Sequence, residues 1–124
     1  MTKPRPKYLN LPAIRLPLPG ILSIFHRISG ALLIIALPFA LWALDLSVAS
    51  EESYAQVAKC LSHPFIKLCV WGAAWALFHH SCAGARFLLL DFHIGASLPA
   101  ARFSAGLAFA ASIVMTIAFG VWLW

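Results

Sequence analysis

The chain is 124 residues long, 62% hydrophobic and only 10% charged, with a formal net charge of +5 and a mean hydropathy of +0.88. Soluble domains carry roughly 25% charged residues, so this composition excludes an ordinary soluble fold and is typical of a membrane protein. The positive charge is not accompanied by a basic patch with interleaved aromatic residues, so we do not expect a nucleic acid partner.

Residues 1–20 form a basic arm that contains no acidic residue. Prolines disfavour helical backbone at and before their own positions, so this arm is expected to be irregular and to face anionic lipid or a docked protein on the cytoplasmic side. Its basic residues and prolines are Lys3, Arg5, Lys7 and Arg15, with Pro4, Pro6, Pro12, Pro17 and Pro19.

Three apolar blocks follow the arm. Each reaches the roughly 20 residues that a helix needs to cross about 30 Å of hydrocarbon. Lipid offers no hydrogen-bond partners to the backbone, so these blocks must be helical. The sequence therefore predicts an all-α membrane protein. Its single transmembrane anchor domain over residues 21–124 would hold three helices at about 21–45, 64–91 and 100–124.

The charges between the blocks predict the orientation of the chain. The first connection holds Glu51 and Glu52 against Lys59, whereas the second leads to Arg102. By the positive-inside rule, the N-terminus and the second connection face the cytoplasm, and the first connection and the C-terminus face the periplasm. A short basic start without a transit peptide favours a bacterial inner membrane.

The first helix carries a polar stripe near its start. Its members are spaced i, i+3, i+4 and i+7, so they share one helix face: Ser23, His26, Arg27 and Gly30. A hydroxyl, an imidazole and a guanidinium beside a glycine favour an anionic or carbonyl-bearing ligand. Alternatively, Arg27 snorkels to the lipid headgroups and His26 makes a helix contact.

The second helix contains two adjacent histidines, and ionisable groups in a membrane segment indicate function. His80, Gly84 and Asp91 share one face, whereas His79 and Arg86 line another. A histidine one turn from a glycine suits an axial haem ligand, because neutral imidazole coordinates iron and glycine leaves room for a flat macrocycle. The alternative is an interhelical hydrogen bond.

Periodicity does not decide which of the two histidines would bind iron. No obvious position offers a second axial ligand, since the other histidines lie near a membrane boundary or at helix ends, so if haem is bound a partner subunit would supply it. The third helix carries small residues every four positions, which favour close packing within this chain or against a partner: Ser104, Ala108, Ser112, Thr116 and Gly120.

Two segments resemble signatures of a known family. The segment Ser23-Ile24-Phe25-His26-Arg27-Ile28-Ser29-Gly30 is similar to the Ser-x-x-His-Arg-x-Ser-Gly signature of the cytochrome b556 membrane-anchor subunits of succinate dehydrogenase. The spacing His80-x-x-x-Gly84-x-Arg86-x-x-x-x-Asp91 resembles that family's second signature. The resemblance spans nearly the whole chain and includes the pair Arg5-Pro6. Departures at Lys7, Leu90 and His93 touch only the motif edges.

The resemblance implies roles for five residues. His80 matches the axial ligand of haem b, with the other ligand coming from a second small anchor subunit. Ser23 and Arg27 match residues of the ubiquinone site beside the iron–sulfur subunit. His26 matches a position near a haem propionate, which Arg27 would also serve, and Gly84 matches a position at the haem face.

The resemblance gives no defined role to Arg86 and Asp91, and it implies that His79 is a packing residue. The family's complex oxidises succinate in a flavoprotein subunit and passes electrons through iron–sulfur centres to quinone at the membrane anchor. The resemblance therefore implies an anchor subunit that has no dicarboxylate active site of its own. The alternatives are a fumarate reductase anchor, a haem-free structural anchor and a small transporter, although transporter-like repeats or paired broken helices are not evident in the sequence.

Overall fold

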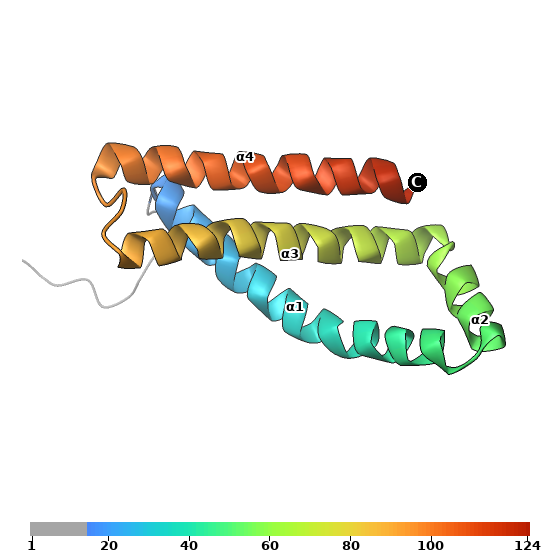
Figure 1. Cartoon of the computed structure of the whole chain (residues 1–124). Helices are drawn as coiled ribbons and strands as arrows, with labels where there is room; N and C mark the ends of the chain where they lie inside the picture. The colour runs from blue at the N-terminus through green and yellow to red at the C-terminus, as the bar shows by residue number, and fades with distance from the viewer. Residues whose placement is uncertain (1–14) are drawn as a thin grey trace, which may run out of the picture.

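The computed structural model describes residues 15–124, which fold into four helices (Figure 1). They are α1 (Leu18–Ala49), α2 (Glu51–Leu61), α3 (Pro64–Asp91) and α4 (Leu98–Leu123). No strand occurs between residues 15 and 124, which confirms the predicted all-α class. Residues 1–14, most of the predicted basic arm, lie outside the described part.

Helix α1 is longer than predicted at both ends. It begins at Leu18, three residues inside the predicted arm, because Pro19 falls in the first turn, where a missing backbone N–H costs nothing. The N–H groups of Gly20 and Ile21 donate to the Pro17 carbonyl and close this first turn. The helix then continues to Ala49, four residues past the expected end.

Helix α2 was not predicted and occupies the expected first connection. Ser50 caps it in a reciprocal capping box with Ser53, each backbone N–H donating to the other side chain at 3.1 Å. Glu51 and Glu52 in the first turn and Lys59 in the last match the helix dipole. These local signals stabilise a polar helix that a search for apolar blocks does not detect.

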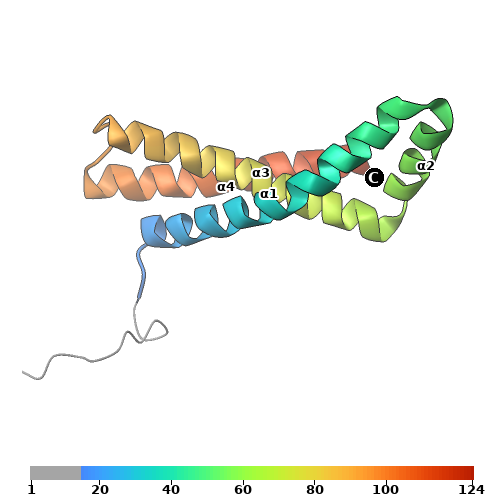
Figure 2. The same ribbon diagram turned by 90° about the horizontal axis from the view of Figure 1, so that it is seen from below.

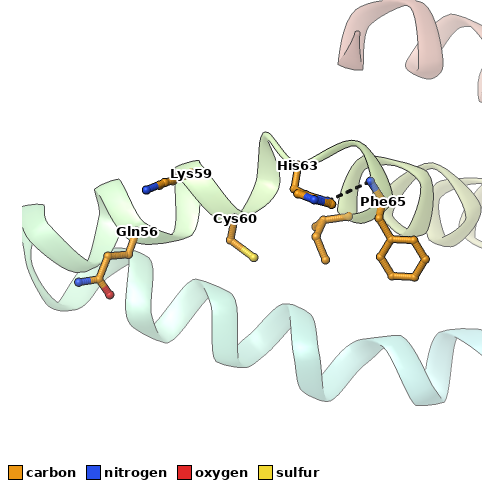
Figure 3. A pocket seen from close by; sticks show the side chains of 6 residues that line it. Gln56, Lys59, Cys60, His63 and Phe65 are labelled. Carbon is orange, nitrogen blue, oxygen red and sulfur yellow. Dashed lines mark hydrogen bonds between the residues drawn. The ribbon is translucent and has the colours of Figure 1, made fainter.

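The junction between α2 and α3 bends the chain by 84°. Figure 3 shows this junction, where the Nδ1 atom of His63 accepts a hydrogen bond from the Phe65 N–H at 3.3 Å. Helices α1 and α4 are each long and apolar enough to cross a membrane, whereas α3 qualifies only together with α2. Residues 15–124 thus hold two candidate spans, or three if the bent pair counts as one.

Helices α3 and α4 run antiparallel side by side, and α1 crosses them obliquely with its N-terminal half against them (Figures 1 and 2). The buried core consists mainly of small side chains, while large apolar side chains point outward, as Ile34 does with 75% exposure. This distribution of small buried and large exposed apolar side chains is the reverse of that in a soluble protein, and it is typical of a helical bundle surrounded by lipid. The core residues are Leu22, Ala76, Ala83, Ala105 and Ala108.

The small residues that recur every four positions on α4 pack against α3 of the same chain rather than against a partner. The Trp71 indole N–H donates to the Thr116 carbonyl at 2.8 Å. A Cβ atom at Gly120 would lie only 2.6 Å from the Trp71 Nε1 atom, so only glycine permits this approach. The ladder therefore holds two helices of this chain together.

Candidate functional site

The two sequence motifs meet where α1 crosses α3. The imidazole rings of His26 and His80 are stacked, with centroids 4.1 Å apart and planes 10° from parallel. Phe87, one turn beyond Ala83 on α3, packs edge-on against the His26 ring at 5.1 Å. A site with contributions from both helices thus forms within the chain.

Hydrogen bonding fixes the orientation of the His80 imidazole. Its Nδ1 atom lies 3.1 Å from the His26 carbonyl oxygen and 3.4 Å from the Ser29 hydroxyl oxygen. A carbonyl oxygen only accepts, so the hydrogen bond requires the proton on Nδ1, and we infer the tautomer on that ground. The Nε2 atom of neutral His80 then carries a free lone pair, with no hydrogen-bond partner among residues 15–124.

Two glycines lie against the stacked rings, and at Gly30 the approach is too close for a side chain without a shift. A Cβ atom at Gly30 would lie 3.0 Å from the Cε1 atom of His80 and 3.3 Å from Nδ1. A Cβ atom at Gly84 would lie 3.4 Å from the Nε2 atom of His26. The structure therefore brings Gly84 against a histidine ring of α1, while Gly30 faces the His80 ring.

His79 lies on a different face of α3 and is fully buried. Its ring stacks on Trp75 at 5.5 Å and packs against Phe109 at 5.1 Å, and its Nδ1 atom lies 3.4 Å from the Ser112 hydroxyl. Its Nε2 atom is buried and has no partner in the described part of the chain. This enclosure by α3 and α4 fits a packing residue.

Ser23 and Arg27 lie one turn apart on α1, beside His26. Ser23 is half-buried and Arg27 is exposed. Within the described range, no ion pair or side-chain hydrogen bond engages either residue. Among residues 15–124, the hydroxyl and the guanidinium beside His26 are therefore available to bind a ligand.

Arg86 and Asp91 of the second motif are separated rather than paired. Arg86 is buried and donates to the Ser104 hydroxyl and to the Ala101 carbonyl, both at 3.0 Å, so it joins the end of α3 to the start of α4. Its Nη1 atom is buried without a partner among residues 15–124. Asp91 is exposed at the last position of α3.

Ser29, Gly30 and Phe87 contact the histidine pair, and sequence reasoning assigned no contact with it to any of them. Ser29 is fully buried and its hydroxyl donates to the His26 carbonyl at 2.9 Å. Both Ser29 and Gly30 belong to the first signature, which was the available signal. For Phe87, the sequence gave no signal, because this residue stands next to Arg86 in an ordinary apolar run.

The donor set of this site favours a prosthetic group over a bare metal ion. Residues 15–124 contain no cluster of three or more metal-ligating side chains. His80 instead offers one imidazole nitrogen whose opposite nitrogen is held by a backbone carbonyl, an arrangement common for metal-bound histidines. A macrocycle that brings its own equatorial donors needs only such a single axial ligand from this chain.

Residues 1–119 match the family described as succinate dehydrogenase/fumarate reductase transmembrane subunit. Relatives named succinate dehydrogenase cytochrome b556 subunit include one from Coxiella burnetii, 38% identical over the full length of both chains. One from Rickettsia felis is 33% identical over 91% of this chain and 88% of its own. One from Paracoccus denitrificans is 31% identical over 91% of this chain and 87% of its own. The chain therefore belongs to the family of succinate dehydrogenase and fumarate reductase transmembrane subunits.

Proposed function

We propose that this chain is the cytochrome b556-type membrane anchor of a succinate dehydrogenase, and that it binds haem b and ubiquinone. The observation that carries the proposal is the His80 imidazole, whose Nδ1 atom is hydrogen-bonded to the His26 carbonyl and whose Nε2 atom has no hydrogen-bond partner in the described part of the chain. The proposal is supported further by the shared name of the full-length relative and by both sequence motifs meeting at this point.

His80 would hold the haem iron through Nε2, with the second axial ligand supplied by the second small anchor subunit. When bound, haem b supplies a one-electron carrier inside the membrane. His26 and Arg27 would stabilise the propionates, and Gly84, which lies beside the His26 ring, would lie at the haem face. His79 is the weaker candidate for this role, because its ring is fully buried and packed against aromatic residues of three helices.

Ser23 and Arg27 would bind ubiquinone. Their side chains have no partner in the described part of the chain, so binding breaks no internal contact. The Ser23 hydroxyl donates to one quinone oxygen, or the Arg27 guanidinium offsets the negative charge that develops there on reduction. In a site largely free of water, such a charge is stabilised far more than in bulk solvent.

The chemistry on succinate belongs to the partners, a flavoprotein subunit and an iron–sulfur subunit that docks on the cytoplasmic side. At one end of the bundle α1 begins, α3 ends and α4 begins, while α2 with its two glutamates lies at the other (Figure 1). Arg15, Arg27 and Arg102 belong to the first end, which supports a cytoplasmic N-terminus and a periplasmic C-terminus in a bacterial inner membrane. A fumarate reductase anchor, which shares the family, is the second candidate.

Replacing each histidine of the adjacent pair tests the proposal. The reduced-minus-oxidised visible spectrum of the purified complex is expected to lose its b-type α band in His80→Leu. The band persists in His79→Leu, provided that the variant assembles. Loss of haem in His79→Leu with retention in His80→Leu would reverse the assignment.

A further inference from the structure

The His26 carbonyl oxygen is shared by two hydrogen-bond donors, the Ser29 hydroxyl at 2.9 Å and the His80 Nδ1–H at 3.1 Å. We propose that Ser29 is a positioning residue that sets how strongly the His80 imidazole donates electrons, and that Gly30 sets the angle of its ring. This inference rests on the proposed function of His80 as an axial ligand.

The role of Ser29 follows from the shared carbonyl. An acceptor that already takes one hydrogen bond offers less electron density to the second, so the Ser29 hydroxyl weakens the pull of the carbonyl on the His80 Nδ1 proton. Without the hydroxyl, the carbonyl would draw that proton more strongly and make Nε2 more basic. A more basic axial imidazole favours ferric over ferrous iron, so the haem midpoint potential falls.

Because Ser29 is buried, water cannot take over the role of its hydroxyl. Its side chain is fully buried, so water cannot replace the hydroxyl on the carbonyl without a rearrangement. The Ser29 hydroxyl oxygen also lies 3.4 Å from the His80 Nδ1–H and can accept from it, but this contact is longer than the 3.1 Å bond to the carbonyl. The carbonyl is therefore the main acceptor, and its competition for the two donors sets the direction of the effect.

Gly30 affects the orientation of the His80 ring through van der Waals contact and not through hydrogen bonding. A methyl group at this position would lie 3.0 Å from the His80 Cε1 atom, closer than normal carbon contacts, so the ring would have to move by a few tenths of an ångström. Rotation of an axial imidazole changes the orientation of its π-orbitals relative to the iron. The Gly30→Ala variant should therefore alter the low-spin electron paramagnetic resonance signal.

The chain offers a matched control for each change. Ser112 is also fully buried, its hydroxyl donates to the carbonyl three residues earlier at 2.9 Å, and it lies 3.4 Å from the Nδ1 atom of His79. Ser112→Ala thus repeats the Ser29→Ala change beside the other histidine. Gly72 is the control for Gly30, because a Cβ atom there would meet nothing within 4 Å.

The experiment compares these four variants in the assembled complex by redox titration of the haem and by electron paramagnetic resonance. Ser29→Ala is expected to lower the midpoint potential and Gly30→Ala to shift the low-spin signal, while Ser112→Ala and Gly72→Ala match wild type. If Ser29→Ala does not assemble, Ser29→Cys, which keeps a weaker donor, must shift the potential in the same direction.

An unchanged or raised potential in Ser29→Ala, or an equal shift in Ser112→Ala, would overturn the role of Ser29. An unchanged resonance signal in Gly30→Ala would overturn the role of Gly30. Failure of the proposed function looks different, because then the wild-type complex lacks haem or His80→Leu retains it. If the haem is lost in His80→Leu but its potential and resonance signal are unchanged in Ser29→Ala and Gly30→Ala, only the roles of Ser29 and Gly30 are refuted.

Discussion

Replacing Arg27 by leucine should separate quinone reduction from succinate oxidation. The Arg27 side chain is exposed and has no ion pair within residues 15–124, so its removal should cost the fold nothing. A hydrogen bond from a charged donor is worth about 1.5–3 kcal/mol. Each 1.4 kcal/mol corresponds to about a factor of ten, so the rate of succinate-driven ubiquinone reduction should fall roughly ten- to a hundredfold.

The assay measures two activities of the same purified complex. Electrons are passed from succinate either to ubiquinone or to an artificial dye that accepts them from the soluble subunits. Arg27→Leu should lower the first rate and leave the second near wild type. A matched variant on the same helix, Ile34→Leu, changes an exposed apolar residue and should affect neither. Equal loss of both activities in Arg27→Leu, or no loss of either, would refute the role of Arg27.

Two further predictions concern the contact between α3 and α4, and both are measured as the midpoint of thermal unfolding of the complex in detergent. Gly120→Ala should destabilise the protein by about 1–3 kcal/mol, because the new methyl group overlaps the Trp71 indole and displaces it from its hydrogen bond to the Thr116 carbonyl. Gly72→Ala, whose methyl group meets no neighbour within 4 Å, should leave the midpoint unchanged. An unchanged midpoint in Gly120→Ala would show that Trp71 moves freely. Arg86→Lys should cost about 1.5–3 kcal/mol, because a lysine cannot bond Ser104 and Ala101 with the arginine's fork; a midpoint at the wild-type value would contradict this reasoning.

Much of the helical framework was predictable because strong local signals mark it. Pro64 and Pro99 fall in the first turns of α3 and α4, and the apolar runs behind them give bounds within two residues of those observed. Helix α2 was missed because its residues are polar and its stability comes from the Ser50 cap and the dipole charges. Apolar periodicity carries no information about such a helix.

The histidine pair could be predicted only in part. Both motifs marked His26 and His80, but periodicity within one helix says nothing about how two helices are aligned with each other. The contact of Ser29 with His80 joins residues 51 positions apart and depends on that alignment. Helical serines commonly bond their own backbone, as Ser29 also does, so the sequence alone gave no reason to expect a second contact.

The family resemblance assigned the ligand role to His80 and a packing role to His79, whereas helix periodicity did not separate the two histidines. The two residues are adjacent and chemically identical, but their surroundings in the fold differ. Phe109 and Ser112 of α4 and Phe25 of α1 contact His79, while the Nε2 atom of His80 has no hydrogen-bond partner among residues 15–124. The same packing explains Arg86, whose acceptors lie on α4 rather than on Asp91.

One measurement tests the proposed anchor function most directly. The complex is purified through an affinity tag on this chain, and succinate-dependent reduction of ubiquinone is followed together with the haem content. We predict that a flavoprotein and an iron–sulfur subunit copurify, that succinate reduces ubiquinone, and that a b-type haem is present. A chain that purifies without these subunits, or a complex that carries no haem and passes no electrons from succinate to ubiquinone, would contradict the proposal.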